Sequence, residues 1–317
     1  TNQYLLVVNA SNADKDWDWL NAVNEGRVIL DRDRPALTPE GKAILRNLKD
    51  PSSGEDQRVD LALQGPASLA LLQSLTEDRE LKAALARVRR TELIECALAG
   101  FDLIIARTGY CGEKIGYEIF VHPDRAVAFW LHLLERGASF GLKPAGLGAR
   151  DSTRIEAGLP LYGHELAGPF NIDPVAAGFG SYVKLHKPFF IGRKAFIEKA
   201  LQGKKQIVRF RMNEKGVRMP SLGDPVLNKR GKVIGNVTSC SLDSHGYLLG
   251  LALVDKRFSK EGTPIGIFVL PHHEERTLPP EKPKDQLSEG DQVLLHDEAT
   301  VISRFPGENE IQSWRLT

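Results

Sequence analysis

The 317-residue sequence predicts an α+β protein made of two domains, because the pattern of strands and helices changes near residue 203. Before that point, strand-like segments alternate with amphipathic helical segments. After it, short strands follow one another and are separated by Gly, Pro and Asn, which is typical of a small antiparallel β-barrel or jelly roll. We therefore expect a mixed domain over residues 1–202 and a C-terminal β-barrel domain over residues 203–317.

In the first domain, Pro and Gly mark the ends of the elements, and apolar residues repeat with the period of a strand or a helix. Asn12 or Asp14 is expected to cap a first helix that carries Trp17, Leu20 and Val23 on one face. Further helices are expected at 39–48, 67–75, 78–88, 123–137 and 147–157, and strands at 5–8, 27–31, 59–63, 92–97, 101–107 and 117–121.

The second domain is expected to consist mainly of strands. A segment rich in Pro, Glu and Lys at 271–290 interrupts them and is expected to be a mobile loop. The strands are expected at 207–212, 226–228, 233–238, 248–254, 265–270, 292–296 and 300–304.

Composition argues against several classes of function. The chain carries 42 Lys and Arg against 41 Asp and Glu, so its net charge of +1 provides no field that would attract nucleic acid or an anionic membrane. Its longest apolar run, 247–254, is far shorter than the ~20 residues of a membrane-spanning helix. The three cysteines are scattered, which favours a cytoplasmic protein (or a mitochondrial matrix protein in a eukaryote) over a disulfide framework.

The chain begins without an initiator Met, and the strand-like segment at 5–8 follows with no leader, turn or cap before it. A strand of this kind is typical of the interior of a domain. We therefore expect the sequence to be a fragment that lacks the first part of its first domain.

Motifs for metal and nucleotide chemistry are missing from the sequence. It contains no Cys-x-x-Cys, no His-Glu-x-x-His and no complete P-loop, so neither a metal site nor nucleotide hydrolysis is predicted. His272 and His273 fall in the 271–290 segment and are interpreted as a solvated pair. Cys111 lies in a Gly-rich turn that would suit a nucleophile, but no His is near it in sequence, and we interpret it as an unreactive thiol.

A glycine-rich turn at 107–116 leads into a strand that places Glu118 and Phe120 on the face opposite to Tyr117. A carboxylate that points inward from a strand needs partners. It can accept two parallel hydrogen bonds from a flat heterocycle that presents two adjacent N–H groups. The spacing leaves a second interpretation open, in which Glu118 pairs with Arg107 or faces water.

Two arginines lie close together on the helix expected at 147–157. Arg150, Asp151 and Arg154 are three or four residues apart and share nearly one face. Two guanidinium groups on one side could clamp a dicarboxylate or a polyglutamate tail. They could equally form surface ion pairs with Asp151 and Glu156, and the spacing does not decide between the two.

Short motifs of this chain occur in one order that resembles a known family. They are Val8-Asn-Ala-Ser-Asn-Ala-Asp-Lys-Asp16, Leu63-Gln-Gly-Pro66, Arg107-Thr-Gly-Tyr-x-Gly-Glu113, Gly116-Tyr-Glu-Ile119, Gly146-Leu-x-Ala-Arg-Asp151, Arg154-x-Glu-Ala-Gly-Leu-x-Leu-Tyr-Gly163, Pro174-x-x-Ala-Gly178 and Phe190-Ile-Gly192. In this order the chain resembles the aminomethyltransferases, or T-proteins, of the glycine cleavage system. Each motif is weak alone, and the ordered set is specific for the folate-binding superfamily.

The resemblance implies a tetrahydrofolate-binding domain at 1–202, followed by the barrel. It implies that an aminomethyl group passes from the lipoyl arm of the H-protein to tetrahydrofolate with release of ammonia and without a metal. Glu118 matches the carboxylate that holds the amino group and the ring N–H of the pterin. Arg150 matches a folate-binding arginine, Tyr110 the turn tyrosine beside the ligand, and Asn9 the amide at the end of the first strand.

The chain departs from the family pattern at two places. The turn between Glu113 and Glu118 holds one residue more than usual, so that Glu118 or its loop is expected to be displaced. In the family, a catalytic aspartate lies in an Asp-Asp-Leu stretch just upstream of the strand that ends at Asn9, where its negative charge assists the folate nitrogen. In this chain that stretch would precede Thr1, so no catalytic residue is named.

Two other functions stay open at this point. The chain would also suit a tetrahydrofolate-dependent demethylase of a small methylated compound, because donor specificity can reside in the missing segment. A non-enzymatic folate-binding protein that has lost the aspartate is the other alternative. The expected partners are the lipoylated H-protein and tetrahydrofolate, with no nucleic acid and no membrane.

Overall fold

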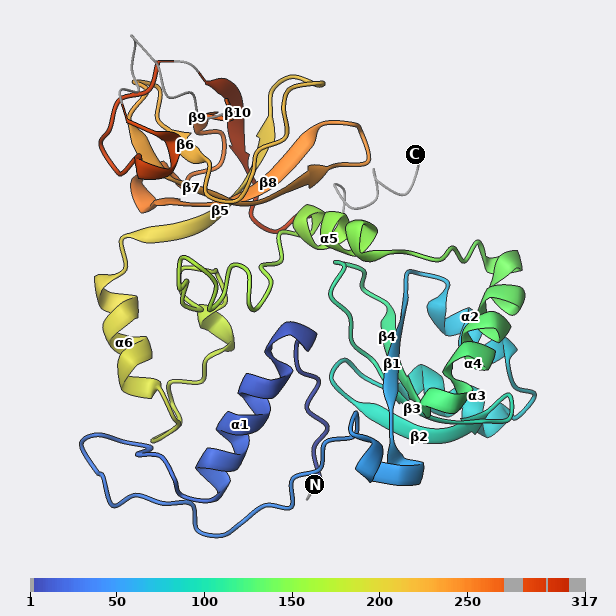
Figure 1. The fold of residues 1–317 in the computed structure, drawn as a ribbon. Helices are drawn as coiled ribbons and strands as arrows, with labels where there is room; N and C mark the ends of the chain where they lie inside the picture. Colours follow the sequence, from blue (N-terminus) through green and yellow to red (C-terminus); the bar gives the residue numbers. More distant parts are fainter. Residues whose placement is uncertain (1–2, 271–281, 295, 308–317) are drawn as a thin grey trace. The chain divides into compact units, whose positions relative to one another are not determined.

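The computed structural model describes residues 3–270, 282–294 and 296–307 of the chain, and these form two compact units (Figure 1). The sheet unit consists of residues 41–150, and the barrel unit consists of residues 1–40 and 151–317. Helix α5 (Leu147–Glu156) contains the boundary between the two units.

A four-stranded antiparallel sheet in the order β1-β4-β3-β2 forms the centre of the sheet unit. Its elements are β1 (Val59–Gln64), β2 (Leu93–Leu98), β3 (Phe101–Ala106) and β4 (Gly116–Val121), the helices α2 (Ser68–Ser74), α3 (Arg79–Arg87) and α4 (Pro123–Gly137), and the 3-10 helices η2 (Pro51–Asp56) and η3 (Ala138–Phe140). Because β4 lies between β1 and β3, both neighbours fix its register.

Local sequence explains where the helices of the sheet unit begin. The side chain of Asp78 accepts hydrogen bonds from the backbone N–H groups of Glu80 at 2.8 Å and Leu81 at 3.3 Å, and so caps α3. Pro123 occupies the start of α4, where its missing N–H leaves no helical hydrogen bond unmade.

One face of this sheet is apolar. Its side chains, among them Leu63, Leu103, Ile105 and Ile119, are almost completely buried and form one core with residues of the helices, such as Leu72. Because successive side chains of a strand alternate between the faces, the residues between them lie on the other face. That face carries Asp60, Ala62, Glu95, Ile104, Ala106, Glu118 and Phe120.

The barrel unit contains a closed six-stranded barrel in the order β10-β5-β8-β7-β6-β9 (Figure 1). Its strands are β5 (Lys205–Met212), β6 (Pro225–Leu227), β7 (Val233–Leu242), β8 (Leu248–Asp255), β9 (Pro264–Ile267) and β10 (Asp297–Ile302), and their pairing is antiparallel throughout. Buried apolar side chains such as Phe210, Val237, Ile267 and Val301 fill it. Closure gives every strand a neighbour on each side.

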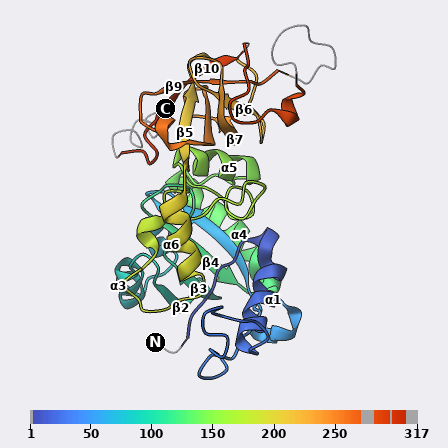
Figure 2. The same cartoon turned by 90° about the vertical axis from the view of Figure 1, so that its left-hand side faces the viewer.

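Outside the barrel, the same unit contains α1 (Ala13–Asn24), α6 (Arg193–Gln202) and the 3-10 helices η1 (Ala10–Asn12), η4 (Gly180–Tyr182), η5 (Lys256–Phe258) and η6 (Lys284–Gln286). Figure 2 shows α6 leading directly into β5 of the barrel. The predicted domain boundary near residue 203 falls between these two elements and stays a prediction.

Several predicted elements of the chain are wrong. Residues 3–9 and 27–31 contain no strand, and residues 39–48 contain no helix. Segment 3–9 has the apolar pattern of a strand but pairs with no strand among the described residues, and a strand needs a partner for its backbone groups. The strand predicted at 292–296 is reduced to a single bridge between Gln292 and Lys232. The histidines at 272 and 273 and most of the predicted 271–290 loop lie outside the described residues.

Candidate functional site

Glu118 lies in the middle of β4, the strand that has a neighbour on each side. It pairs in register with Ala62 of β1 and Ala106 of β3, so the side chains beside it in register are only methyl groups. The Glu118 side chain is partly buried and lies on the face of β4 opposite to Tyr117, as the alternation predicts, whereas the apolar core lies on the Tyr117 face.

The electrostatic surroundings of Glu118 oppose its negative charge. Burial raises the pKa of Glu118 above its ordinary value, and the charge of Asp60 on β1 raises it further. The positive charge of Arg150 acts in the opposite direction. All three residues belong to the sheet unit. Burial and the charge of Asp60 together raise the pKa of Glu118 by more than the charge of Arg150 lowers it. The protein therefore stabilises the negative charge of Glu118 only in part, which is typical of a carboxylate whose remaining hydrogen-bond donors come from a ligand.

Arg107 has a different partner from the one that the second sequence interpretation gave it. Its Nη1 donates a hydrogen bond to the carbonyl oxygen of Val88 at 3.1 Å. Its charge acts on Tyr117, which lies on the opposite face of β4 from Glu118. Arg107 therefore belongs to the core side of the sheet.

Tyr110 lies in the loop 107–115 that joins β3 to β4, and its side chain is partly buried. Gln64, the last residue of β1, connects this loop to the sheet. Its Nε2 donates to the carbonyl oxygens of Thr108 at 3.3 Å and Tyr117 at 3.2 Å. In the sequence, Gln64 is noted only within the motif Leu63-Gln-Gly-Pro66, and this role was not predicted.

Cys111, in the same loop, is a hydrogen-bond donor. Its thiol donates to Oε1 of Gln64 at 3.4 Å. Burial raises the pKa of the Cys111 thiol, and the charge of Glu113 raises it as well, so the thiol stays protonated at neutral pH. This supports the interpretation of Cys111 as unreactive. All three cysteines of the chain are free.

The two arginines of α5 differ in their surroundings, which argues against a two-arginine clamp. Arg150 is exposed and belongs to the sheet unit, where its charge acts on Glu118. Arg154 is 1% exposed and belongs to the barrel unit. Its guanidinium contacts Asp151 at 2.7 Å, one of the ion pairs that the spacing suggested.

Arg154 also forms a buried network that the sequence analysis missed. Its Nη1 donates to both carboxylate oxygens of Glu165, at 3.1 and 3.0 Å, and its Nη2 donates to Oγ of Ser239 on β7 at 2.8 Å. Glu165 also accepts a hydrogen bond from the backbone N–H of Leu161 at 2.7 Å and one from the Ser239 hydroxyl. The network joins α5, the loop after it and the barrel, so its role is structural.

Asn9 precedes the 3-10 helix η1 in the barrel unit. Its Oδ1 accepts a hydrogen bond from the Ser11 hydroxyl at 3.1 Å, and its carbonyl oxygen accepts one from the backbone N–H of Asn12 at 3.0 Å. These contacts place the Asn9 amide in a turn. Glu118, Tyr110 and Arg150 lie in the sheet unit and Asn9 in the barrel unit.

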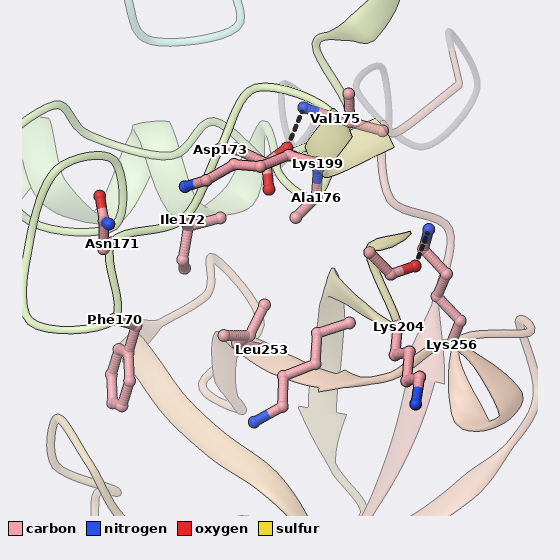
Figure 3. A pocket seen from close by; sticks show the side chains of 12 residues that line it. Phe170, Asn171, Ile172, Asp173, Val175, Ala176, Lys199, Lys204, Leu253 and Lys256 are labelled. Carbon is pink, nitrogen blue, oxygen red and sulfur yellow. Dashed lines mark hydrogen bonds between the residues drawn. The ribbon is translucent and has the colours of Figure 1, made fainter. Parts of the chain in front are cut away.

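A cavity of about 170 Å³ lies in the barrel unit (Figure 3). It is lined by Phe170, Asn171, Ile172, Asp173, Val175, Ala176, Lys199, Gly203, Lys204, Lys205, Leu253 and Lys256. Its polar groups largely hold the chain together: Lys256 donates to the carbonyl oxygen of Gly203 at 2.7 Å, Lys205 pairs with Glu289, and Asp173 accepts from the backbone N–H groups of Val175 and Ala176 at 2.9 and 3.1 Å. We interpret the cavity as a packing gap between the α6–β5 connection and β8.

Among residues 3–270, 282–294 and 296–307, no group of three or more His, Cys, Asp or Glu side chains is placed to hold a metal ion. Within the same ranges, every helix is too short or too polar to cross a lipid bilayer.

Curated proteins similar to this chain are aminomethyltransferases. Those of Caldanaerobacter subterraneus subsp. tengcongensis and Bacillus subtilis are each 37% identical to it, over 277 and 272 residues, and that of Alkaliphilus oremlandii is 40% identical over 272 residues. Each alignment covers 84% of this chain. The chain spans only 64%, 66% and 65% of the length of these three relatives, respectively.

A solved structure and a family model agree with these relatives. The crystal structure of the glycine cleavage system aminomethyltransferase T from Bartonella henselae matches with a TM-score of 0.58 and 26% identity, over 78% of this chain and 59% of that one. The model of the GCVT N-terminal domain matches residues 1–187, which is more than half of the chain. This chain therefore belongs to the GCVT N-terminal domain family.

Proposed function

We propose that the protein is a tetrahydrofolate-dependent aminomethyltransferase of glycine cleavage. The aminomethyl donor is the lipoyl arm of the H-protein. The carbon–sulfur bond and the carbon–nitrogen bond of the aminomethyl group break, and two bonds form from its carbon to folate nitrogens. The two protons that these nitrogens lose leave with the lipoyl thiol and ammonia, and methylenetetrahydrofolate is the product.

Glu118 carries the proposal. It is a partly buried carboxylate on a central strand, between two alanines and with a raised pKa. The amino group and the adjacent ring N–H of a pterin match its two oxygens, and their hydrogen bonds would stabilise the ionised form that burial disfavours. Arg150 supports the same assignment, because its charge already favours ionised Glu118. We assign Tyr110 to the folate site on the family resemblance alone, and the match of Asn9 to the family pattern stays a prediction.

The test is tetrahydrofolate binding by the Glu118→Gln variant, measured by isothermal titration calorimetry with the protein at its natural length. Gln keeps the shape but replaces one acceptor by a donor. Losing a charge-assisted pair is expected to weaken binding by about 1.5–3 kcal/mol, or about 10- to 150-fold.

Glu95→Gln is the matched control, because Glu95 is an exposed glutamate on the same face of the same sheet but on the edge strand β2. This variant should bind tetrahydrofolate like the wild type. Equal affinity of the Glu118→Gln variant and the wild type would contradict the pterin assignment. Release of ammonia from aminomethyl-loaded lipoylated H-protein tests the reaction itself, because a demethylase would bind folate but release none.

A further inference from the structure

The loop that carries Tyr110 leaves the sheet before it turns. Strands β3 and β4 are paired in register as far as Ala106 and Glu118, and residues 107–115 beyond this pair form an open loop. Glu118 is the third residue after the loop. A nine-residue connection between two hairpin strands is long, so something besides strand pairing must fix its conformation.

The side chain of Gln64 fills the opening between the two arms of this loop. Its amide nitrogen donates one hydrogen bond to the carbonyl oxygen of Thr108 on the outgoing arm, at 3.3 Å, and another to that of Tyr117 on the returning arm, at 3.2 Å. Its amide oxygen accepts from the Cys111 thiol at 3.4 Å, in the middle of the loop. One side chain therefore ties two points of the loop and the start of β4 to the end of β1.

Two glycines make room for this amide. A Cβ atom added to Gly109 or to Gly116 would overlap the Gln64 side chain. Neither glycine has the positive φ that only glycine adopts easily, in contrast to Gly112 with a φ of 85°. Gly109 and Gly116 are therefore required for space, and the three residues form one packed unit.

We infer that Gln64 is a positioning residue of the proposed tetrahydrofolate site, which fixes the loop of Tyr110 and the start of the strand of Glu118. The inference rests on the proposed function. Both N–H groups of the amide are already engaged with backbone carbonyls, and its oxygen accepts a thiol, so Gln64 has little hydrogen-bonding capacity left for a ligand. It acts through the loop and not on the folate.

The test compares Gln64→Leu with Gln73→Leu. Gln73 of α2 lies in the same unit and also donates its amide to a backbone carbonyl, that of Lys82 at 2.9 Å, but this partner belongs to α3 and not to the loop. Both variants should lower the melting temperature. Only Gln64→Leu should weaken tetrahydrofolate binding, by about 10-fold, because the three hydrogen bonds of the amide are lost.

Gly109→Ala provides a second, independent variant. Its methyl group would displace the Gln64 amide, so the variant should also weaken tetrahydrofolate binding while changing no polar group. Because both changes act on one contact, Gly109→Ala should have little further effect on binding in the Gln64→Leu background. A role in general stability alone would not produce this non-additivity.

The two proposals fail in different ways. If the wild type does not bind tetrahydrofolate, the proposed function is wrong. If the wild type binds but Gln64→Leu and Gly109→Ala bind equally well, or if their effects simply add, the positioning role of Gln64 is wrong. Should Gln64→Leu fail to fold, unchanged affinity of the Gly109→Ala variant alone would overturn the inference.

Discussion

Glu165 of the barrel unit and Glu118 of the sheet unit are both carboxylates removed from water, but the protein treats them in opposite ways. Glu165 is completely buried, with an exposed fraction of 0%. Burial opposes its ionisation, but Arg154, the Leu161 N–H and Ser239 together lower its pKa below the ordinary value. Glu118 is only partly buried, yet its pKa is raised.

The difference shows that the depth of burial alone does not determine the charge state of a carboxylate. The deciding factor is how many donors and positive charges the chain places around it. Glu165 has its partners within the chain and therefore serves the structure. Glu118 has Asp60 as a neighbour and only one opposing positive charge, that of Arg150, so a ligand with two N–H donors would improve its surroundings.

The largest expected effect comes from breaking the Glu165 network. Glu165→Ala leaves the Arg154 guanidinium buried without its main counter-charge, and we expect the free energy of unfolding of the barrel unit to fall by about 3–5 kcal/mol. Chemical denaturation followed by circular dichroism measures it. The double variant Arg154→Met, Glu165→Leu should recover most of the loss, because it removes both charges. A loss below about 1 kcal/mol in Glu165→Ala would show that the pair is solvated.

A smaller effect of opposite sign is expected for Glu118→Gln. The raised pKa means that Glu118 binds its proton more tightly in the folded wild type than in the unfolded chain. The free energy of unfolding should therefore fall as the pH rises from about 4.5, the ordinary glutamate pKa, through the pKa of the folded state. Glu118→Gln mimics the protonated form and should therefore melt at a higher temperature than the wild type at pH 7.

The pH dependence is the decisive part of this second prediction. The difference in melting temperature between Glu118→Gln and the wild type should shrink toward zero as the pH falls below about 4.5, where the wild-type carboxyl becomes protonated in both states. Glu95→Gln, on the exposed edge strand, should show no such pH-dependent gain. A constant difference at all pH values would mean that Glu118 is not destabilised by its charge.

Sequence reasoning was accurate about where several elements lie. Helix α4 (Pro123–Gly137) begins at the predicted proline and ends at the predicted glycine, and six of the expected barrel strands are present. The expected strand at 5–8 and the helix at 39–48 failed, because a local pattern does not show whether a partner strand or a packing surface is available.

The same limit applies to the candidate site. Strict alternation along β4 was enough to place Glu118 on the face opposite to Tyr117, but not to show that the apolar core lies on the Tyr117 face. The contacts of Arg154 and Gln64 could not be predicted, because their partners are distant in sequence: Ser239 lies 85 residues from Arg154, and Thr108 lies 44 residues from Gln64. Only the fold brings these groups together.

The smallest expected effect separates the two causes of the raised Glu118 pKa. The pKa of Glu118 is raised first by burial and then by the negative charge of Asp60. Asp60→Asn removes this charge, so the pKa of Glu118 should fall toward its ordinary value without reaching it, because burial remains. NMR titration of the Glu118 side-chain carboxyl carbon measures the change, and Glu95→Gln, with β3 between its strand and that of Glu118, should leave it unaltered. An unchanged pKa in Asp60→Asn would make burial the only cause, and the contrast with Glu165 would then depend entirely on the donors that surround the buried carboxylate.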